Sequence, residues 1–284
     1  MRLILINVVA FVLIRILAVG SWMVGGNDVL AWVALPSNLW MLLKRPWTLL
    51  TYMFAHADLL HILFNMLWLY WMGRIFMEFF SSKHLTGLYL LGGWGGAALF
   101  LLAYNVLPGL AGEVDVRLLG SSAAVIAIVV ATAVYVPDYK IGLLFLGEVA
   151  IKWVAIVTVL IAVLSLDAGN VGGSIAHMGG AAVGAWFAWR IKQGRDITRP
   201  LNATIDALVA LFNGRSMPSM STKKHKTRRA ERPAEPARNQ TSRRPDDGVS
   251  EEELDAILGK IKAAGYDALT DEERDKLFKV SRRK

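Results

Sequence analysis

The sequence contains no cysteine, and it places few charges in its first two thirds. Without cysteine the chain can form no disulfide bond, and it offers neither a thiol nucleophile nor a thiolate ligand for a metal ion. The zinc-binding pattern His-Glu-x-x-His is also absent. Only three acids lie near apolar segments, and they form no facing pair: Glu78, Glu148 and Asp167. We therefore expect no metal ion and no cofactor.

Hydrophobic residues, by contrast, make up 55% of the 284 residues, and ten of them are tryptophan. A bilayer core of roughly 30 Å is crossed by about 20 apolar residues in a helix, so the repeated apolar runs are typical of membrane spans. We expect an all-α polytopic membrane protein, a bundle of six transmembrane helices at residues 3–24, 59–80, 85–107, 120–136, 153–166 and 174–191.

Several segments between these spans need separate interpretation. Residues 25–60 form a long connection rich in Trp, Leu and Met, which we place in the membrane interface. Lys83 and His84 are expected to close the second span. Residues 141–152 are also placed at the interface, with Glu148 and Lys152 one helical turn apart and able to pair. Arg15 interrupts the first span, and it must face a neighbouring helix, extend to the surface, or mark the true start of the span.

The distribution of Lys and Arg predicts the orientation of the bundle. Residues 1–24 lack a small-residue cleavage site and are expected to stay as the first span. Six spans place both termini on one side, and the basic residues concentrate there; the other side has only Lys44, Arg45 and Arg117. Basic residues favour the cytoplasmic side, so both termini are predicted to be cytoplasmic, with the inner membrane of a bacterium as the simplest setting.

The chain is expected to divide into three parts. Residues 1–194 form the membrane domain, which carries only 11 of the 31 Lys and Arg residues. Residues 195–249 are basic, contain proline and are expected to be a disordered linker. Residues 250–284 are expected to form a small cytoplasmic helical hairpin, because Ser250 begins a capping box ahead of residues at helical spacing. This hairpin suits docking or a protein partner, and nothing in the tail indicates nucleic-acid binding.

Four polar residues lie inside the apolar spans and are the candidate functional residues: His61, Asn65, Ser122 and His177. Polar groups inside a membrane are costly and usually face a functional interior. The predicted topology places all four in the non-cytoplasmic leaflet, so we expect them to meet. Each residue taken alone could instead serve as hydrogen-bonding contact between helices.

The spacing of these residues predicts their geometry. His61 and Asn65 are four residues apart and share one helix face. Gly180 and Gly184 give the sixth span a face of small residues, and the fourth span offers a matching face at Ala123, Ala124, Ala127 and Ala131. If these faces pack, Ser122 and His177 come within hydrogen-bond reach, as a serine nucleophile and its base require. No carboxylate follows His177, so a dyad is expected; His61, Asn65 and the Ser122 amide are candidate donors to an oxyanion.

At these residues the sequence strongly resembles the rhomboid family of intramembrane serine proteases. The resemblance covers about residues 45–192, and its motifs are Arg45-Pro46-Trp47, Tyr52-Met53-Phe54-Ala55-His56, His61-Ile62-Leu63-Phe64-Asn65, Gly120-Ser121-Ser122 and Ala176-His177-Met178-Gly179-Gly180 through Gly184. It differs from the usual family pattern at two positions, where Ala123 replaces a glycine of the serine motif and Thr48 a common arginine.

The resemblance implies a rhomboid-like bundle and an intramembrane serine endopeptidase that cleaves transmembrane segments of membrane proteins within the lipid bilayer. Ser122 would be the nucleophile and His177 the general base and acid, while His61, Asn65 and the Ser122 amide would form the oxyanion hole. Gly120 would let the chain turn at the nucleophile. The alternative that remains open is a non-catalytic membrane scaffold or chaperone that binds transmembrane helices; a transporter is disfavoured, since no repeated half with interrupted helices is visible.

Overall fold

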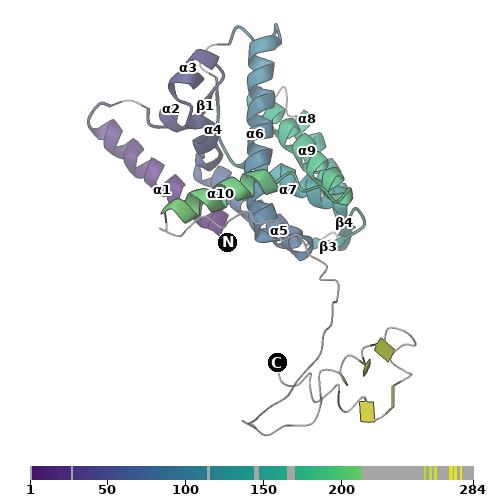
Figure 1. The fold of residues 1–284 in the computed structure, drawn as a ribbon. Helices are drawn as coiled ribbons and strands as arrows, with labels where there is room; N and C mark the ends of the chain where they lie inside the picture. Colours follow the sequence, from purple (N-terminus) through teal and green to yellow (C-terminus); the bar gives the residue numbers. More distant parts are fainter. Residues whose placement is uncertain are drawn as a thin grey trace, which may run out of the picture. The chain divides into compact units, whose positions relative to one another are not determined.

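The computed structural model describes residues 2–26, 28–113, 116–143, 147–164 and 170–212, together with separate residues between 253 and 276. The chain divides into two compact units, Met1–Met220 and Ser221–Lys284. The candidate site lies entirely in the first unit. Within the part of the chain that is described, that unit is built mainly from helices (Figure 1).

Among its described residues, the first unit has seven helices of at least 14 residues, and six of them match the expected spans to within a few residues. They are α1 (Arg2–Met23), α5 (Leu59–Phe79), α6 (Ser82–Val106), α7 (Ser122–Tyr135), α8 (Ile151–Leu164), α9 (Val171–Lys192) and α10 (Arg199–Phe212). By length and composition, α1, α5 and α6 could cross a membrane. Three of the six predicted spans thus meet this criterion on their own.

The other three helices are either shorter or less apolar. Helices α7 and α8 have 14 residues each, which corresponds to about 21 Å against a bilayer core of about 30 Å. Helix α9 has 22 residues, but its glycines, Ser174 and His177 lower its hydropathy. Helix α7 is enclosed by protein and can be short, because its neighbours supply the surface that meets the lipid, whereas most residues of α8 are exposed or partly exposed.

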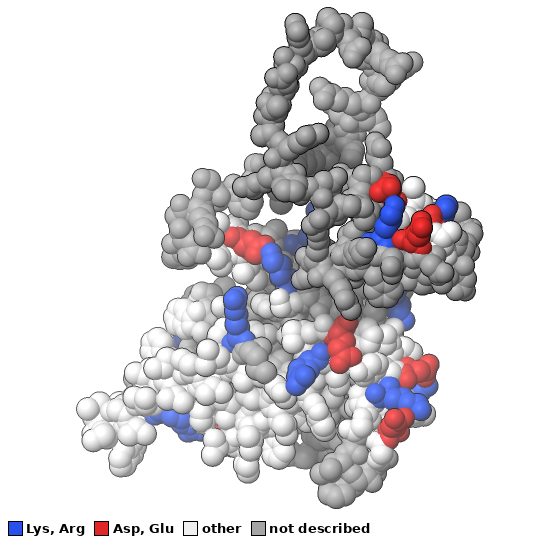
Figure 2. Space-filling model, turned by 90° about the horizontal axis from the view of Figure 1, so that it is seen from below, with Lys and Arg blue, Asp and Glu red and all other residues white. Residues whose placement is uncertain are grey.

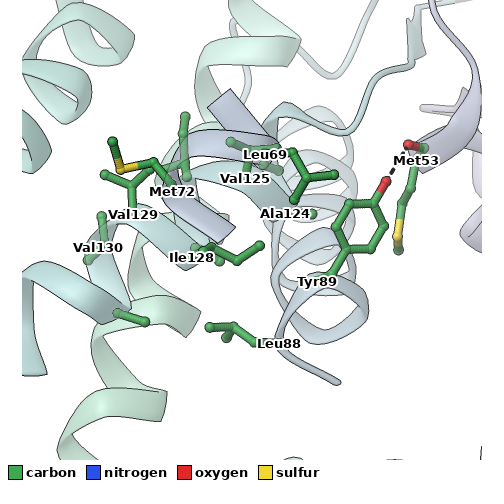
Figure 3. Close-up of a cluster of buried hydrophobic side chains, with 14 of the residues drawn as sticks. Met53, Leu69, Met72, Leu88, Tyr89, Ala124, Val125, Ile128, Val129 and Val130 are labelled. Carbon is green, nitrogen blue, oxygen red and sulfur yellow. Dashed lines mark hydrogen bonds between the residues drawn. The ribbon is translucent and has the colours of Figure 1, made fainter. Parts of the chain in front are cut away.

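Helix α7 occupies the centre of the unit, where it packs against α5, α6, α8 and α9. All but three of its 14 residues are buried, and most of them are alanine, valine or isoleucine. Figure 3 shows Ala124, Val125 and Ile128 of this helix among Leu69 and Met72 of α5 and Leu88 and Tyr89 of α6. The small side chains of α7 let four helices approach one axis, so the start of α7 is held on several sides.

The connection between α1 and α5 contains short elements in place of an irregular loop. They are α2 (Leu30–Val33), β1 (Leu35–Pro36), α3 (Leu39–Lys44), α4 (Thr48–Thr51) and the 3-10 turn η1 (Tyr52–Phe54). Strand β1 pairs antiparallel with β2 (Arg117–Leu118), with Leu35 opposite Leu118. Trp32 stacks on Trp47 at 6.5 Å, and the Arg45 guanidinium lies 4.3 Å from the Trp32 ring. This aromatic, partly exposed surface suits the interfacial position predicted for the segment.

The boundaries predicted for α6 and α9 are wrong, and the reasons are local. Lys83 and His84 do not close α5; they lie in the first turn of α6, because Ser81 and His84 form a reciprocal capping box. Helix α9 begins at Val171, three residues before the predicted start at Ser174, because the Asn170 side chain accepts a hydrogen bond from the Gly173 N–H at 3.1 Å.

The predicted Glu148–Lys152 pair does not form either. Residues in this segment make a β-hairpin of β3 (Lys140–Leu143) and β4 (Gly147–Ala150), with Ile141 opposite Val149. Glu148 pairs with Lys140 across the hairpin at 3.2 Å, and Lys152 pairs with Asp138 at 2.5 Å. Helical spacing gave the wrong partner, since cross-strand neighbours in a hairpin are determined by register.

The linker predicted from residue 195 starts too early. Residues Arg199–Phe212 form α10, an amphipathic helix that packs on α6. Thr198 N–H and Oγ1–H both donate to Asp196 Oδ1, at 2.8 and 2.7 Å, so the chain turns tightly just before this helix. Residues 213–249 of the predicted linker lie outside the described part of the chain, as do Ser250, most of the predicted hairpin and Asp167.

Candidate active site

The backbone before α7 adopts a conformation that needs glycine. Gly120 has φ +110°, in the region that residues with a side chain rarely occupy. Its N–H donates to the Tyr52 carbonyl at 2.9 Å, which ties this turn to the η1 segment. Helix α7 then starts at Ser122, so the Ser122 hydroxyl lies at the N-terminal end of a buried helix. The turn at Gly120 was expected from the resemblance and is present.

Ser122 and His177 are in hydrogen-bonding contact. His177 Nε2 lies 2.7 Å from Ser122 Oγ, although 55 residues separate them in the chain. The contact follows from the close approach of α7 and α9: a Cβ added at Gly180 would lie 2.1 Å from the Ala123 carbonyl oxygen, and one at Gly184 would lie 2.2 Å from that of Ala127. The glycines of α9 thus pack on the small-residue face of α7, as their spacing predicted.

The replacement of glycine by Ala123 is accommodated on its other side by α6. A Cβ added at Gly96 would lie 2.7 Å from the Ala123 Cβ and 2.9 Å from the Ala176 carbonyl oxygen. Gly96 of α6 and Gly180 of α9 therefore both leave room beside Ala123. With Ala123 at this position, α7 starts at Ser122 and the Ser122 hydroxyl contacts His177.

His61 lies beside the same turn. A Cβ added at Gly120 would be 2.8 Å from His61 Nε2 and 3.9 Å from Ser122 Oγ, so the imidazole and the hydroxyl both lie within 4 Å of one point. His61 is in the first turn of α5 because Asp58 caps that helix and accepts from the His61 N–H at 2.8 Å. The structure thus brings His61 together with Ser122 and His177.

Asn65 lies one turn further along the same face of α5 and is buried. Its side-chain amide donates to the His61 carbonyl at 2.8 Å. That bond uses one of the two amide N–H groups and leaves the other available to a ligand. The predicted arrangement of His61 and Asn65 on one helix face is therefore present.

The loop before α5 supports the site, and sequence reasoning gave it no role. His56 is buried, with Nε2 3.3 Å from Ser121 Oγ and its ring edge-on to that of His61. The Ala57 N–H approaches His61 Nδ1 at 3.5 Å, which favours the tautomer with hydrogen on Nε2, the nitrogen nearest Ser122. His56 belongs to the motif quoted for the resemblance. Its supporting role becomes visible only from its burial, which the sequence does not show.

Arg15 of α1 contacts this loop, since its guanidinium donates to the Ala57 carbonyl. Its guanidinium also lies 5.2 Å from the Phe11 ring. One of the three interpretations left open for Arg15 was that it faces a neighbouring helix; the contact observed is instead with the loop before α5. A charge within an apolar helix is thereby satisfied, and α1 is linked to the loop that orients His61.

Together these contacts define a serine–histidine pair beside a second histidine and a buried amide, all placed at helix ends inside an apolar bundle. Among the residues the structure describes, no carboxylate is bonded to His177. No group of three or more potential metal ligands occurs among them either. The geometry can support nucleophilic catalysis by a hydroxyl whose proton is taken by an adjacent imidazole.

Comparisons with known proteins identify the family of this chain. A family model described as "Rhomboid domain" matches residues 43–194, so the chain belongs to the rhomboid family. RHOMBOID-like protein 12, mitochondrial, of Arabidopsis thaliana is 36% identical over 160 residues, which are 52% of this chain and 47% of that protein. The chain thus spans about half the length of the curated relative it matches. Residues 249–283 match a second model, a family of unknown function called DUF6576.

Family membership and the apolar helices make this a multi-pass membrane protein. Rhomboid proteins are usually serine intramembrane proteases, and the family's membrane-embedded fold is consistent with contact with the bilayer and with membrane-protein substrates. The bundle expected from the resemblance is therefore confirmed at the level of the family and of its predominantly helical architecture.

Proposed function

We propose that this protein is an intramembrane serine endopeptidase, with Ser122 as the nucleophile and His177 as the general base and acid. The observation that carries the proposal is the 2.7 Å contact between His177 Nε2 and Ser122 Oγ at the start of a buried helix. Membership of the rhomboid family and the position of His61 beside the same turn support it.

In the proposed reaction, the Ser122 oxygen attacks the carbonyl carbon of the scissile peptide bond while its proton passes to His177 Nε2. The negative oxygen that develops is stabilised by His61 Nε2–H, the free Asn65 N–H and the Ser122 backbone N–H, each donor contributing roughly 3 to 4 kcal/mol. His177 then gives its proton to the leaving amine, which releases one product. Water, deprotonated by His177, hydrolyses the acyl-enzyme and restores the Ser122 hydroxyl.

The substrate of this reaction is a transmembrane segment, entering from the lipid and unwinding locally. Unwinding is required because the peptide bonds of a helix are hydrogen-bonded and shielded. We also propose six spans, cytoplasmic termini and an active site that opens to the non-cytoplasmic side of a cell inner membrane. The concentration of Arg2, Arg74, Lys83, Arg190 and Lys192 at one end of the bundle supports this orientation.

The first test is labelling of the purified, detergent-solubilised protein with a fluorophosphonate probe. Wild type is expected to be labelled, and Ser122→Ala and His177→Ala are expected to lose the label. Ser82→Ala is the matched control. It removes a hydroxyl from the first residue of α6, away from the site, and is expected to label normally. A folded wild type that takes no label would contradict the dyad and favour the alternative, a non-catalytic scaffold that binds transmembrane helices.

For the C-terminal unit we propose a helical hairpin that binds a protein partner. The described residues of this unit include two ion pairs between its halves: Lys276 with Glu253 at 3.2 Å, and Lys260 with Glu273. The Thr270 N–H also donates to Glu273 Oε2 at 2.9 Å, as expected where a helix is capped. Deletion of residues 249–284 is expected to leave fluorophosphonate labelling intact and to abolish co-purification of a partner.

A further inference from the structure

A cavity of about 730 Å³ lies at the end of the bundle opposite the serine site, between α1, α5, α6 and α10. The walls from α1 and α5 are largely apolar and include Leu3, Ile6, Leu69 and Met77. Three basic residues stand around it: Arg2 at the start of α1, Arg74 near the end of α5 and Lys83 in the first turn of α6. The reaction proposed above uses none of these residues.

The basic residues of the cavity outnumber its acids. Asp206 of α10 is the acid among the lining residues, and it pairs with Lys83 at 2.6 Å. The Arg74 guanidinium donates to the Tyr70 hydroxyl at 3.0 Å and lies over its ring, but within the described part of the chain it has no acidic partner. Arg2 likewise has none there. Two guanidinium groups are therefore available to an anion at the same cavity.

The wall formed by α10 is held in place by its own contacts. Thr198 is buried against α6, since a Cβ added at Gly87 would lie 2.6 Å from the Thr198 Cβ. His84 Nε2 lies 3.2 Å from Asp196 Oδ2, just before α10 begins. The Lys83–Asp206 pair adds a second connection, to the middle of α10. Helix α10 is thus fixed against the first turns of α6 by several contacts.

Helix α10 also has the character of a helix that lies in a membrane surface. Ile205 and Val209 line the cavity, and beside them Leu208 and Leu211, which lie at helical spacing, are 52% and 66% exposed. An amphipathic helix with an exposed apolar stripe buries that stripe at the boundary between headgroups and acyl chains. Figure 2 views the molecule from below and shows Lys and Arg side chains spread among residues of other kinds. The cavity mouth therefore lies at the depth of lipid headgroups.

From this geometry we infer that the cavity binds an anionic phospholipid. The phosphate accepts hydrogen bonds from Arg2 and Arg74, and the acyl chains follow the apolar wall of α1 and α5 into the bilayer. Guanidinium groups match phosphate oxygens in a fork geometry, which favours a phosphate ligand. The apolar wall is what favours a lipid over free phosphate, and basic pockets between membrane helices on the side richer in Lys and Arg are suited to such headgroups.

The test uses the full-length protein in nanodiscs and measures lipid retained after transfer to detergent by native mass spectrometry. Wild type is expected to retain phosphatidylglycerol and to lose phosphatidylcholine. The variant Arg2→Gln/Arg74→Gln is expected to retain phosphatidylglycerol about 25-fold less tightly, because each basic residue near an anionic headgroup contributes roughly a factor of five. Both side chains are exposed, so the double variant is expected to fold. Arg74→Gln alone should bind phosphatidylglycerol about five-fold less tightly than wild type.

Lys140→Gln/Lys152→Gln provides the matched control, since it removes two charges from the same end of the bundle outside the cavity. It is expected to bind phosphatidylglycerol as wild type does. The inference is overturned if the two double variants lose lipid equally, if phosphatidylcholine is retained as well as phosphatidylglycerol, or if millimolar inorganic phosphate displaces the lipid. None of these outcomes depends on peptidase activity.

Discussion

The packing of α9 on α7 makes Gly180→Ala a sharp test of how the site is assembled. The added Cβ would lie 2.1 Å from the Ala123 carbonyl oxygen and 3.0 Å from the Ala123 Cα, which are backbone atoms with no rotamer to change. Relief requires the helices to separate by about 1 Å, and a misplacement of about 1 Å at reacting groups can cost about 100-fold in rate. His177 is less than one turn from Gly180, so its 2.7 Å contact with Ser122 should lengthen.

The expected change in stability is smaller than the change in reactivity. Overpacking costs typically 1–3 kcal/mol, and the better helix propensity of alanine offsets about 1 kcal/mol of it. The variant should therefore fold, with a slightly lower melting temperature, and label with fluorophosphonate about 100-fold more slowly than wild type.

Gly73→Ala of α5 is the matched control, because a Cβ there meets only Leu85 at 3.8 Å, an ordinary contact. It changes a buried glycine in an apolar helix without a clash, so it should label at the wild-type rate and be equally stable or slightly more so. If Gly180→Ala labels as fast as Gly73→Ala, close packing at Gly180 does not position His177, and the reasoning is refuted.

Three further predictions concern two supports of the site and the cap of α6. Gly120→Ala should abolish labelling while the protein still folds, because φ +110° and a Cβ 2.8 Å from His61 Nε2 are both unfavourable to a side chain; normal labelling would contradict the described turn. Arg15→Gln should lower the rate of substrate cleavage several-fold, with Arg15→Lys in between, because the Ala57 loop loses its anchor; kcat and KM measured separately should show the loss in kcat. Ser81→Ala should lower the free energy of unfolding by about 1 kcal/mol through loss of the α6 cap, without changing labelling; equal stability would show that the capping box contributes nothing.

The sequence predicted the helices and the contact between α7 and α9 because both depend on short-range patterns. The apolar runs gave α1 and α5 to within a residue and α6 to within three residues, and the spacing of Gly180 and Gly184 gave the face that packs on Ala123 and Ala127. Small residues allow backbones to approach in only a few ways, so a repeat of small residues carries three-dimensional information.

The errors occurred where tertiary partners decide local structure. Residues 141–150 read equally well as an interfacial helix. The hairpin register, which places Lys140 opposite Ala150 and diagonal to Glu148, has no helical signature. Helix α10 was included in the linker because the composition of residues 195–249 as a whole is basic and polar, which hid one amphipathic stretch docked on α6. The support that His56 and Arg15 give to His61 could not be seen, because it depends on burial and on contacts between distant segments.

The burial of α7 also bears on how the protein would respond to different membranes. Bilayers differ in thickness, and a helix exposed to lipid adjusts by tilting or by deforming the bilayer around it. Helix α1 is exposed to lipid in this way, since its outward side chains such as Leu5, Ile16 and Leu17 are at least 60% exposed. Helix α7 meets other helices on nearly every side, so the residue at its start is shielded from hydrophobic mismatch, and the same reactive geometry can be kept in thin and thick membranes alike.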